Sequence, residues 1–339
     1  MKKSIALILV GVICSLFSFF NIAAAQNLND NGRGVNMIKV SFKNNNVTMV
    51  GNLYLPANFD KSKKYPAIVV AHPWGGVKEQ TSGLYARNLA EQGFIALAYD
   101  ASHYGESGGE PRFMENPTDR VEDIRSAVDY LSNHNQVDEK RIGALGICAG
   151  GGYTISAAQT DLRIKAVAGI STYDVGAAAR EGLKNVWPVS DAQRIQILKD
   201  AALQRTKEAR GEAARIDKLL PTSTPPATAP QFIRDAYDYY NTLRGRQPNA
   251  TGNFRFTSTI RQMEFFPFEH IETISPRPLL LIAGSEAETL YFSQNAYEKA
   301  KDPKELFIIT GASHFDMYDK LQYVTPAVAK LAEFFGKNL

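Results

Sequence analysis

The sequence predicts an α/β protein built on a mostly parallel, twisted sheet of about eight strands, with helices on both faces. Short runs rich in Val, Ile and Leu alternate with helix-compatible segments along most of the chain, and such continuous apolar runs are typical of strands buried on both faces. The alternation stops over about residues 177–268, which we interpret as a helical cap inserted into a domain that spans residues 26–339.

The composition is that of an ordinary globular protein. Of the 339 residues, 44% are hydrophobic and 22% are charged, which provides enough apolar material for a large core. The formal net charge of +3 is close to neutral for this length, so we expect neither nucleic acid nor an acidic membrane surface as a partner. These quantities leave the oligomeric state open.

The first 25 residues are typical of a secretory signal peptide. Two lysines precede an apolar stretch at residues 5–20, and a run of alanines ending at Ala25 provides the cleavage site. We expect cleavage after Ala25 and a periplasmic or secreted protein without a membrane segment, and a retained anchor is the alternative. Because Cys14 leaves with this segment, Cys148 remains alone and cannot form an internal disulfide.

The first part of the domain predicts a hairpin followed by two buried strands. Residues 37–42 and 47–55 alternate in polarity and are expected to pair as an antiparallel hairpin at one sheet edge. Residues 66–71 are a β-branched run and predict a fully buried strand. A helix over residues 78–92, ended by a glycine, leads to another buried strand at residues 94–99.

The middle of the chain continues this pattern and then departs from it. A helix is expected over residues 119–131, and strands over residues 141–147 and 164–170. Within the cap, residues 191–219 and 231–244 are strongly helical, with a Pro-, Thr- and Ala-rich linker between them.

After the cap the alternation resumes. Residues 278–283 and 305–309 predict strands, and residues 291–301 predict the helix between them. A closing helix is expected over residues 325–335, with Pro326 in its first turn.

The most informative motif is G-I-C-A-G at residues 146–150, which lies between a predicted strand and a predicted helix. A G-x-nucleophile-x-G motif in that context predicts a nucleophile elbow, here with Cys148 at its tip. Glycines at 146 and 150 allow the tight turn, and the helix directs its positive N-terminal end towards the sulfur. The alternative is a buried structural cysteine beside a glycine-rich turn.

A second motif, H-P-W-G-G at residues 72–76, follows the buried strand at residues 66–71. An oxyanion needs two N–H donors, and the usual pair comes from this loop and from the residue after the nucleophile. We assign the backbone amides of Trp74 and Ala149 to this role. A plain β-to-α turn in which Trp74 only packs is the alternative.

The base is predicted from chain order. A cysteine nucleophile needs a base, and in this architecture the order is nucleophile, acid, histidine. Of the five histidines, only His314 follows a late strand, in the loop G-A-S-H at residues 311–314. We therefore predict His314 as the catalytic base.

The acid that orients this histidine is less well specified. The loop after residues 278–283 contains Glu286 and Glu288, although an aspartate is commoner there. We prefer Glu288, because it lies further along the loop, and keep Glu286 and Asp174 as alternatives. Either glutamate could instead be a solvated loop charge.

Together these stretches resemble the α/β-hydrolases. The resemblance is carried by the motifs at residues 72–76, 146–150 and 311–314 and by G-E-S-G-G at residues 105–109. The cysteine in the elbow resembles the dienelactone-hydrolase-like branch, and within it the bacterial YcjY-type hydrolases. The resemblance covers nearly all of the mature chain and implies an α/β-hydrolase fold, although residues 182–268 are only weakly diagnostic.

The implied chemistry is acyl transfer to water. Cys148 would attack an ester, lactone or thioester carbonyl to form a thioester acyl-enzyme, while the Ala149 and Trp74 amides hold the oxyanion. His314 would protonate the leaving group and then activate water, with Glu288 fixing its tautomer.

The expected partner is a small ester-type substrate, and the sequence gives no metal-ligand cluster or phosphate loop that would imply a cofactor. Two other functions stay open: a catalytically inactive binding protein with this fold, and an acyltransferase that uses the same site.

Overall fold

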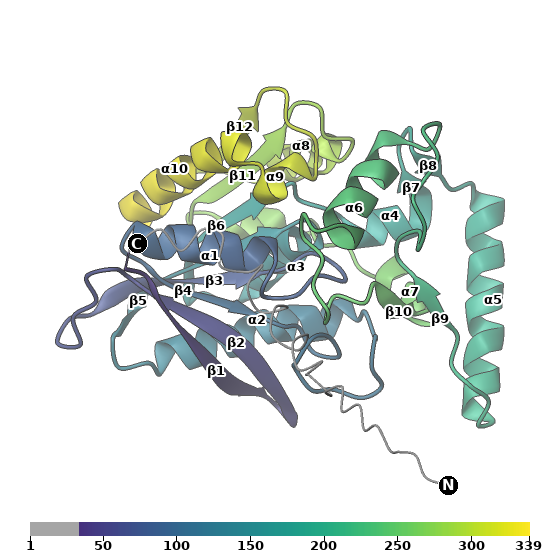
Figure 1. Cartoon of the computed structure of the whole chain (residues 1–339), viewed down its shortest axis with the longest axis horizontal. Helices are drawn as coiled ribbons and strands as arrows, with labels where there is room; N and C mark the ends of the chain where they lie inside the picture. The colour runs from purple at the N-terminus through teal and green to yellow at the C-terminus, as the bar shows by residue number, and fades with distance from the viewer. Residues whose placement is uncertain (1–33) are drawn as a thin grey trace, which may run out of the picture. The chain divides into compact units, whose positions relative to one another are not determined.

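An eight-stranded sheet organises residues 34–339, the part of the chain that the computed structural model describes (Figure 1). Its strands lie in the order β1-β2-β4-β3-β5-β6-β11-β12. They are β1 (Asn36–Asn44), β2 (Val47–Leu55), β3 (Tyr65–Ala71), β4 (Ile95–Tyr99), β5 (Val137–Ile147), β6 (Ile164–Ile170), β11 (Leu279–Gly284) and β12 (Lys304–Ile309). The predicted signal peptide lies outside the described residues.

Neighbouring strands are parallel from β4 to β12, whereas the pairs β1–β2 and β2–β4 are antiparallel. Strands β4 and β11 are buried along their whole length, whereas most residues of the edge strand β1 are exposed. This contrast follows from the covering helices, because a strand with helices on both faces has no side open to water. The predicted fold class and the edge hairpin are confirmed.

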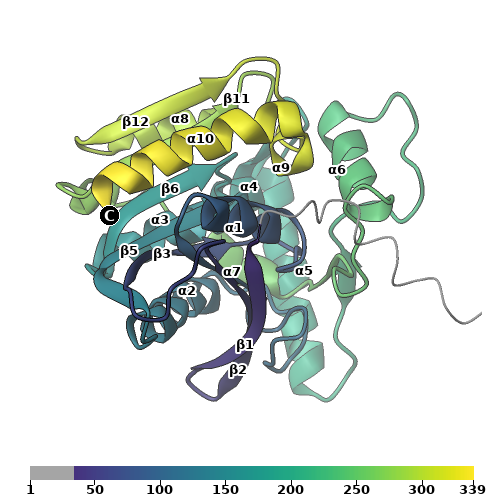
Figure 2. The ribbon, with the colours of Figure 1, turned by 60° about the vertical axis from the view of Figure 1, so that its left-hand side comes forward.

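Helices cover both faces of the sheet (Figure 2). On one face α1 (Thr81–Glu91) packs against α10 (Leu321–Asn338), and on the other α2 (Pro117–Ser132) packs against α3 (Ala149–Thr160). Helix α8 (Leu290–Lys299) packs on β11 and β12. Helix α10 begins four residues before its predicted start, so Pro326 lies inside it rather than at its first position.

The segment between β6 and β11 adds no strand to the main sheet, among the residues described here. Two small two-stranded sheets, β7-β8 and β9-β10, lie among its helices, beyond the carboxyl ends of the parallel strands (Figure 1). Its elements are α4 (Val175–Glu181), β7 (Gly182–Leu183), β8 (Trp187–Pro188), α5 (Asp191–Ala209), β9 (Ile216–Lys218), α6 (Gln231–Asn241), β10 (Asn253–Arg255), α7 (Ser258–Met263) and the 3-10 helix η1 (Ile271–Ile274).

The helix predicted over residues 191–219 is shorter than expected. Helix α5 ends at Ala209, and Gly211 then adopts a φ of 88°, which turns the chain out of the helix. The residues that follow form β9 instead. Within residues 34–339, no helix is both long and apolar enough to span a membrane.

Candidate active site

Cys148 occupies the tip of a strained turn between β5 and α3. Its backbone has φ 57° and ψ −125°, a conformation that residues other than glycine rarely adopt. In an elbow of this kind it projects the side chain away from the sheet. A Cβ atom at Gly146 would lie 2.1 Å from the Gly150 carbonyl oxygen, and one at Gly150 would lie 2.5 Å from the Ala71 oxygen. Both positions therefore require glycine, as an elbow of this kind does.

Two backbone amides converge on the sulfur. Hydrogen bonding from the backbone N–H groups of Ala149 and Trp74 acts to lower the pKa of the Cys148 thiol, so both amides lie next to the sulfur. These are the two donors that the sequence predicts for an oxyanion hole. When the sulfur attacks a substrate carbonyl carbon, the carbonyl oxygen can take the sulfur's place between the two amides. It would then accept two hydrogen bonds at once.

The loop that carries Trp74 is held rigidly by its neighbour His72. The His72 ring is fully buried, with Nδ1 donating to the Pro73 carbonyl at 2.6 Å and Nε2 accepting from the Ala101 amide at 3.0 Å. Burial lowers the pKa of His72 well below its usual value, so the ring stays neutral. Both ring nitrogens are thus used in fixing the loop, and His72 is not free to act as a base.

A buried ion pair supports the same loop from below. Arg120 Nη2 donates to the His72 carbonyl at 2.7 Å, and Arg120 Nη1 lies 3.2 Å from Glu115 Oε1. Tyr153, on the helix that follows the elbow, donates its hydroxyl to the same Glu115 oxygen at 2.7 Å. The ion pair therefore links the loop of Trp74 to the helix that begins beside Cys148.

His314 lies in the loop between β12 and the short helix α9 (Asp316–Asp319), and its side chain is fully buried. Its Nδ1 is 2.6 Å from Thr289 Oγ1, and its Nε2 is 3.1 Å from the Tyr318 hydroxyl. Burial lowers the pKa of His314 to about 3. The imidazole is therefore neutral at pH 7 and available as a base.

The hydrogen-bond partner of His314 Nδ1 is Thr289, not one of the predicted carboxylates. Glu288 precedes Thr289 but turns elsewhere, and its Oε2 is buried without a partner. Glu286 accepts from the Ser285 hydroxyl at 3.1 Å on an exposed loop. The side chain of Asp174 caps α4, so it accepts from a backbone amide of that helix at 2.8 Å.

Thr289 rather than Glu288 meets His314 because of the direction in which each side chain points. Thr289 is the residue that directly precedes α8, and successive side chains at such a turn point in different directions. A preference based on reach along the loop cannot separate two adjacent residues. Burial raises the pKa of Glu288, and it raises the pKa of Asp174 to about 6 although the nearby Arg180 opposes the increase, so burial dominates at both carboxylates.

Tyr318 is a site residue that the sequence analysis did not select. Its hydroxyl forms hydrogen bonds with both Cys148 Sγ and His314 Nε2. It lies four residues after His314, and residues at this spacing face the same side of a helical turn. The pattern H-x-x-x-Y in the loop was the signal available for it.

Aromatic side chains from the cap close the site above the imidazole. Phe232 of α6 lies 5.3 Å from the His314 ring and 5.0 Å from the Phe315 ring, measured between ring centroids. Trp187 packs on the other side of Phe232 at 5.5 Å. The cap therefore shields the base from water and contributes apolar surface next to it.

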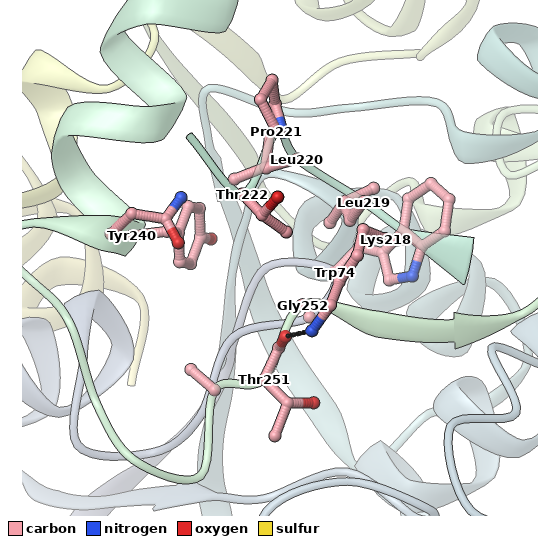
Figure 3. A pocket seen from close by; sticks show the side chains of 12 residues that line it. Trp74, Lys218, Leu219, Leu220, Pro221, Thr222, Tyr240, Thr251 and Gly252 are labelled. Carbon is pink, nitrogen blue, oxygen red and sulfur yellow. Dashed lines mark hydrogen bonds between the residues drawn. The ribbon is translucent and has the colours of Figure 1, made fainter. Parts of the chain in front are cut away.

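A pocket opens beside this cluster, between the Trp74 loop and the cap (Figure 3). It encloses about 400 Å³ of empty space, part of which is open to solvent. Tyr240, on one wall, forms a hydrogen bond with Tyr318, and Trp74 forms part of another wall. The remaining lining residues come from the cap: Lys218, Leu219, Leu220, Pro221, Thr222, Asn241, Ala250, Thr251 and Gly252, together with Gly75 of the loop.

The cap segments that line this pocket are joined to one another. The Leu219 amide donates to the Gly252 carbonyl at 2.8 Å. Lys218 Nζ donates to the Thr251 carbonyl at 3.0 Å, the bond drawn in Figure 3. Among residues 34–339, no three His, Cys, Asp or Glu side chains are grouped so that they could hold a metal ion.

Comparison with known proteins places this chain in a family. The model of the dienelactone hydrolase family matches residues 51–196. The chain is 40% identical to the protein YcjY of Escherichia coli, over 89% of this chain and 99% of YcjY. It is also 25% identical to the thiohydrolase aneE of Aspergillus aculeatus, over 65% of this chain and 69% of that protein.

A solved structure extends the comparison to three dimensions. The chain is 40% identical to PA2218 of Pseudomonas aeruginosa, over 89% of this chain and 80% of that protein. The crystal structure of PA2218 matches with a TM-score of 0.85 over 90% of this chain and 94% of that chain. The chain thus has the α/β-hydrolase fold and belongs to the dienelactone hydrolase family, in the group that includes YcjY and PA2218.

Proposed function

We propose that this protein is a hydrolase that cleaves a carboxylic ester, lactone or thioester through a covalent thioester at Cys148. The observation that carries the proposal is the convergence on one sulfur of two backbone amides and, through one hydroxyl, a neutral imidazole. A strained turn presents that sulfur, and a pocket lined by Trp74 lies beside it.

The resting site holds neutral groups rather than an ion pair. Burial raises the pKa of Cys148 to about 11, although the hydrogen bonds that Tyr318 and Ala149 would donate to the ionised sulfur oppose the increase. The pKa of His314 is lowered to about 3. The thiol is therefore protonated at pH 7, and its proton must leave as the sulfur attacks.

The reaction then follows from the positions of these groups. As Cys148 Sγ bonds to the carbonyl carbon, His314 gains a proton at Nε2 and the amides of Ala149 and Trp74 hold the oxyanion. The imidazolium protonates the leaving group, which departs and leaves a thioester on the sulfur. His314 then takes a proton from water that attacks the thioester, and Thr289 holds Nδ1–H throughout.

The test is turnover of small p-nitrophenyl esters and aryl thioesters, with mass spectrometry of protein quenched during turnover. We expect an acyl adduct on the peptide that contains Cys148 and a loss of at least about 1,000-fold in kcat/KM for Cys148→Ala. Turnover that persists in the Cys148→Ala variant, or an adduct on another residue, would refute the assignment.

An acyltransferase that uses the same site is the second candidate. The observation that favours it is the burial of His314 beneath Phe232, which limits access of water to the base and would prolong the life of the thioester. Alcohol and thiol acceptors should then divert acyl groups from hydrolysis into new esters. If acceptors leave the acid product unchanged in amount, hydrolysis is the reaction.

A binding protein that kept the fold without turnover is the third candidate. It predicts a saturable ligand that is recovered unchanged after prolonged incubation, with no adduct on Cys148. The same quenched-protein experiment decides between this candidate and the two enzymes.

We also propose that the protein is exported from the cytoplasm. The signal-like residues 1–25 support export and cleavage after Ala25, so that the mature protein acts on small ester-type substrates in the periplasm or outside the cell. The mass of the N-terminal peptide of protein isolated from the periplasmic fraction tests this proposal.

A further inference from the structure

The Tyr318 hydroxyl interacts with both the proposed nucleophile, Cys148, and the proposed base, His314. It lies 3.1 Å from His314 Nε2 and is hydrogen-bonded to Cys148 Sγ. The side chain is fully buried, and its ring packs 5.5 Å from the His314 ring, so it is held in place. A proton can therefore move from the thiol to the imidazole through this hydroxyl.

The chain of hydrogen bonds has a consistent direction. Nδ1 of His314 faces Thr289 Oγ1 at 2.6 Å, which suits an Nδ1–H tautomer and leaves a lone pair on Nε2. The Tyr318 O–H can donate to that lone pair while its oxygen accepts from the thiol. Each member thus donates in the same direction, from Cys148 towards Thr289.

We propose that Tyr318 is a further catalytic residue, which relays the Cys148 proton to His314 during nucleophilic attack. The inference rests on the hydrolase or acyltransferase function proposed above. In the relay step the S–H bond breaks and its proton bonds to the Tyr318 oxygen, while the Tyr318 O–H bond breaks and that proton bonds to His314 Nε2. Tyr318 ends neutral, the sulfur carries the new bond to carbon, and His314 becomes an imidazolium.

The surroundings of Tyr318 favour a relay over a stable tyrosinate. Burial raises the pKa of Tyr318 well above its usual value, so the hydroxyl passes a proton on without remaining ionised. The titratable or charged groups that interact with Tyr318 or with its partners include Cys148, Tyr173, Tyr239, Tyr240, His314, Arg120 and Asp319. Tyr240 also hydrogen-bonds with Tyr318, and Tyr318 is the residue that contacts both the sulfur and the imidazole.

The relay is tested by measuring how the rate of Cys148 alkylation by iodoacetamide depends on pH. If His314 takes the proton through Tyr318 as the sulfur attacks, the rate is flat across neutral pH, because the neutral fraction of His314 does not change there. If the thiol must first ionise to solvent, the rate rises about tenfold per pH unit until the thiol pKa is reached.

We expect a flat profile in the wild-type protein. Tyr318→Phe should lower the rate at pH 7 by about 100-fold and convert the flat profile to a rising one. The matched control is Tyr85→Phe, which removes another buried hydroxyl that donates to α9, at the Met317 carbonyl at 2.7 Å, without touching Cys148 or His314. It should keep the flat profile.

Ester turnover measured in parallel separates the relay from the proposed function. A flat profile and wild-type turnover in Tyr318→Phe would overturn the relay and leave the hydrolase standing, and faster alkylation would identify Tyr318 as a blocking group and also overturn it. A rising profile in the wild-type protein overturns the relay whatever the turnover. A flat wild-type profile that Tyr318→Phe abolishes supports the relay even if no ester is turned over.

The wild-type protein provides a second measurement if Tyr318→Phe fails to fold. The alkylation rate at pH 7 is measured in mixtures of H₂O and D₂O. Two protons that move together give a curved dependence on the deuterium fraction, as the relay requires. A linear dependence, which indicates one moving proton, overturns it.

Discussion

Two clusters of polar side chains in this protein, one around Cys148 and one around Lys78, differ in whether their buried groups are neutral or charged. Around Cys148, Tyr318 and His314 burial outweighs the one cation that acts on the thiol in the described part of the chain, Arg120, and keeps each group neutral. Around Lys78 the opposite holds. Burial acts to lower the pKa of Lys78, but Asp100 at 2.8 Å and Glu106 at 2.6 Å outweigh it, and the net effect is to raise that pKa.

The comparison shows what each arrangement is suited to do. A fully paired buried ion cannot give up its charge without leaving its partner uncompensated, so such pairs fix loops in place. Arg120, which holds both Glu115 and the His72 carbonyl, is a pair of this kind beneath the elbow. A chain of neutral groups can instead exchange protons without a change in total charge, which the proposed nucleophilic role of the partly buried Cys148 thiol requires.

Breaking the ion pair beneath the elbow should have the largest effect on stability. Arg120→Leu leaves Glu115 buried and unpaired, so we expect the free energy of unfolding to fall by about 3–5 kcal/mol in urea titrations. The double variant Arg120→Leu/Glu115→Leu should recover part of this loss. Arg163→Leu, which removes more exposed ion pairs, should cost less than about 1 kcal/mol. If Arg120→Leu and Arg163→Leu lowered the free energy of unfolding equally, the buried ion pair would be no more important for stability than the exposed ones.

The pH dependence tests the neutral cluster. Lowering the pH protonates His314 and removes the base, and because burial lowers its pKa to about 3, this loss should occur near pH 3 rather than near the ordinary value of about 6.5. We therefore expect kcat/KM at pH 5 to remain close to its value at pH 7. An ordinary histidine would be about 76% neutral at pH 7 and about 3% neutral at pH 5, so a fall of about 25-fold in kcat/KM between these pH values would show that the base is not buried as described.

Removing the Thr289 hydroxyl, which faces His314 Nδ1, should have a smaller effect on activity and stability. Thr289→Val keeps the shape of the side chain but leaves Nδ1–H without its acceptor, so we expect kcat to fall by about tenfold and stability to fall by about 1–2 kcal/mol. Thr154→Val is the matched control, since its buried hydroxyl has no hydrogen-bond partner, and it should change neither quantity appreciably. Unaltered kcat in Thr289→Val would show that another group orients the imidazole.

The smallest effect is expected for the carboxylate that sequence reasoning preferred. Glu288→Gln keeps the size of a side chain that does not contact His314, so kcat should change by less than about threefold. A fall of about 1,000-fold instead would mean that Glu288 moves to Nδ1 during the reaction and acts as the predicted acid. Measuring kcat for both Glu288→Gln and Thr289→Val decides between the two neighbours.

Local sequence patterns determined the architecture and the elbow. The alternation of apolar runs with helical segments predicted the eight-stranded sheet, because buried parallel strands cannot tolerate polar side chains on either face. The glycines at 146 and 150 are required by contacts with backbone atoms a few residues away or on the next strand, and such contacts follow from the turn itself. The position of His314 after the last strand follows from the same connectivity.

The tertiary structure alone decided what surrounds the reacting groups. Whether Glu288 or Thr289 meets the imidazole depends on side-chain directions where β11 leads into α8, and two adjacent residues carry no local pattern that separates them. The places of Tyr318 and Phe232 depend on how α9 and the cap pack over the sheet. The neutrality of the thiol and the imidazole comes from that packing too, because a pKa shift by burial is a property of everything that excludes water and not of the residue that titrates.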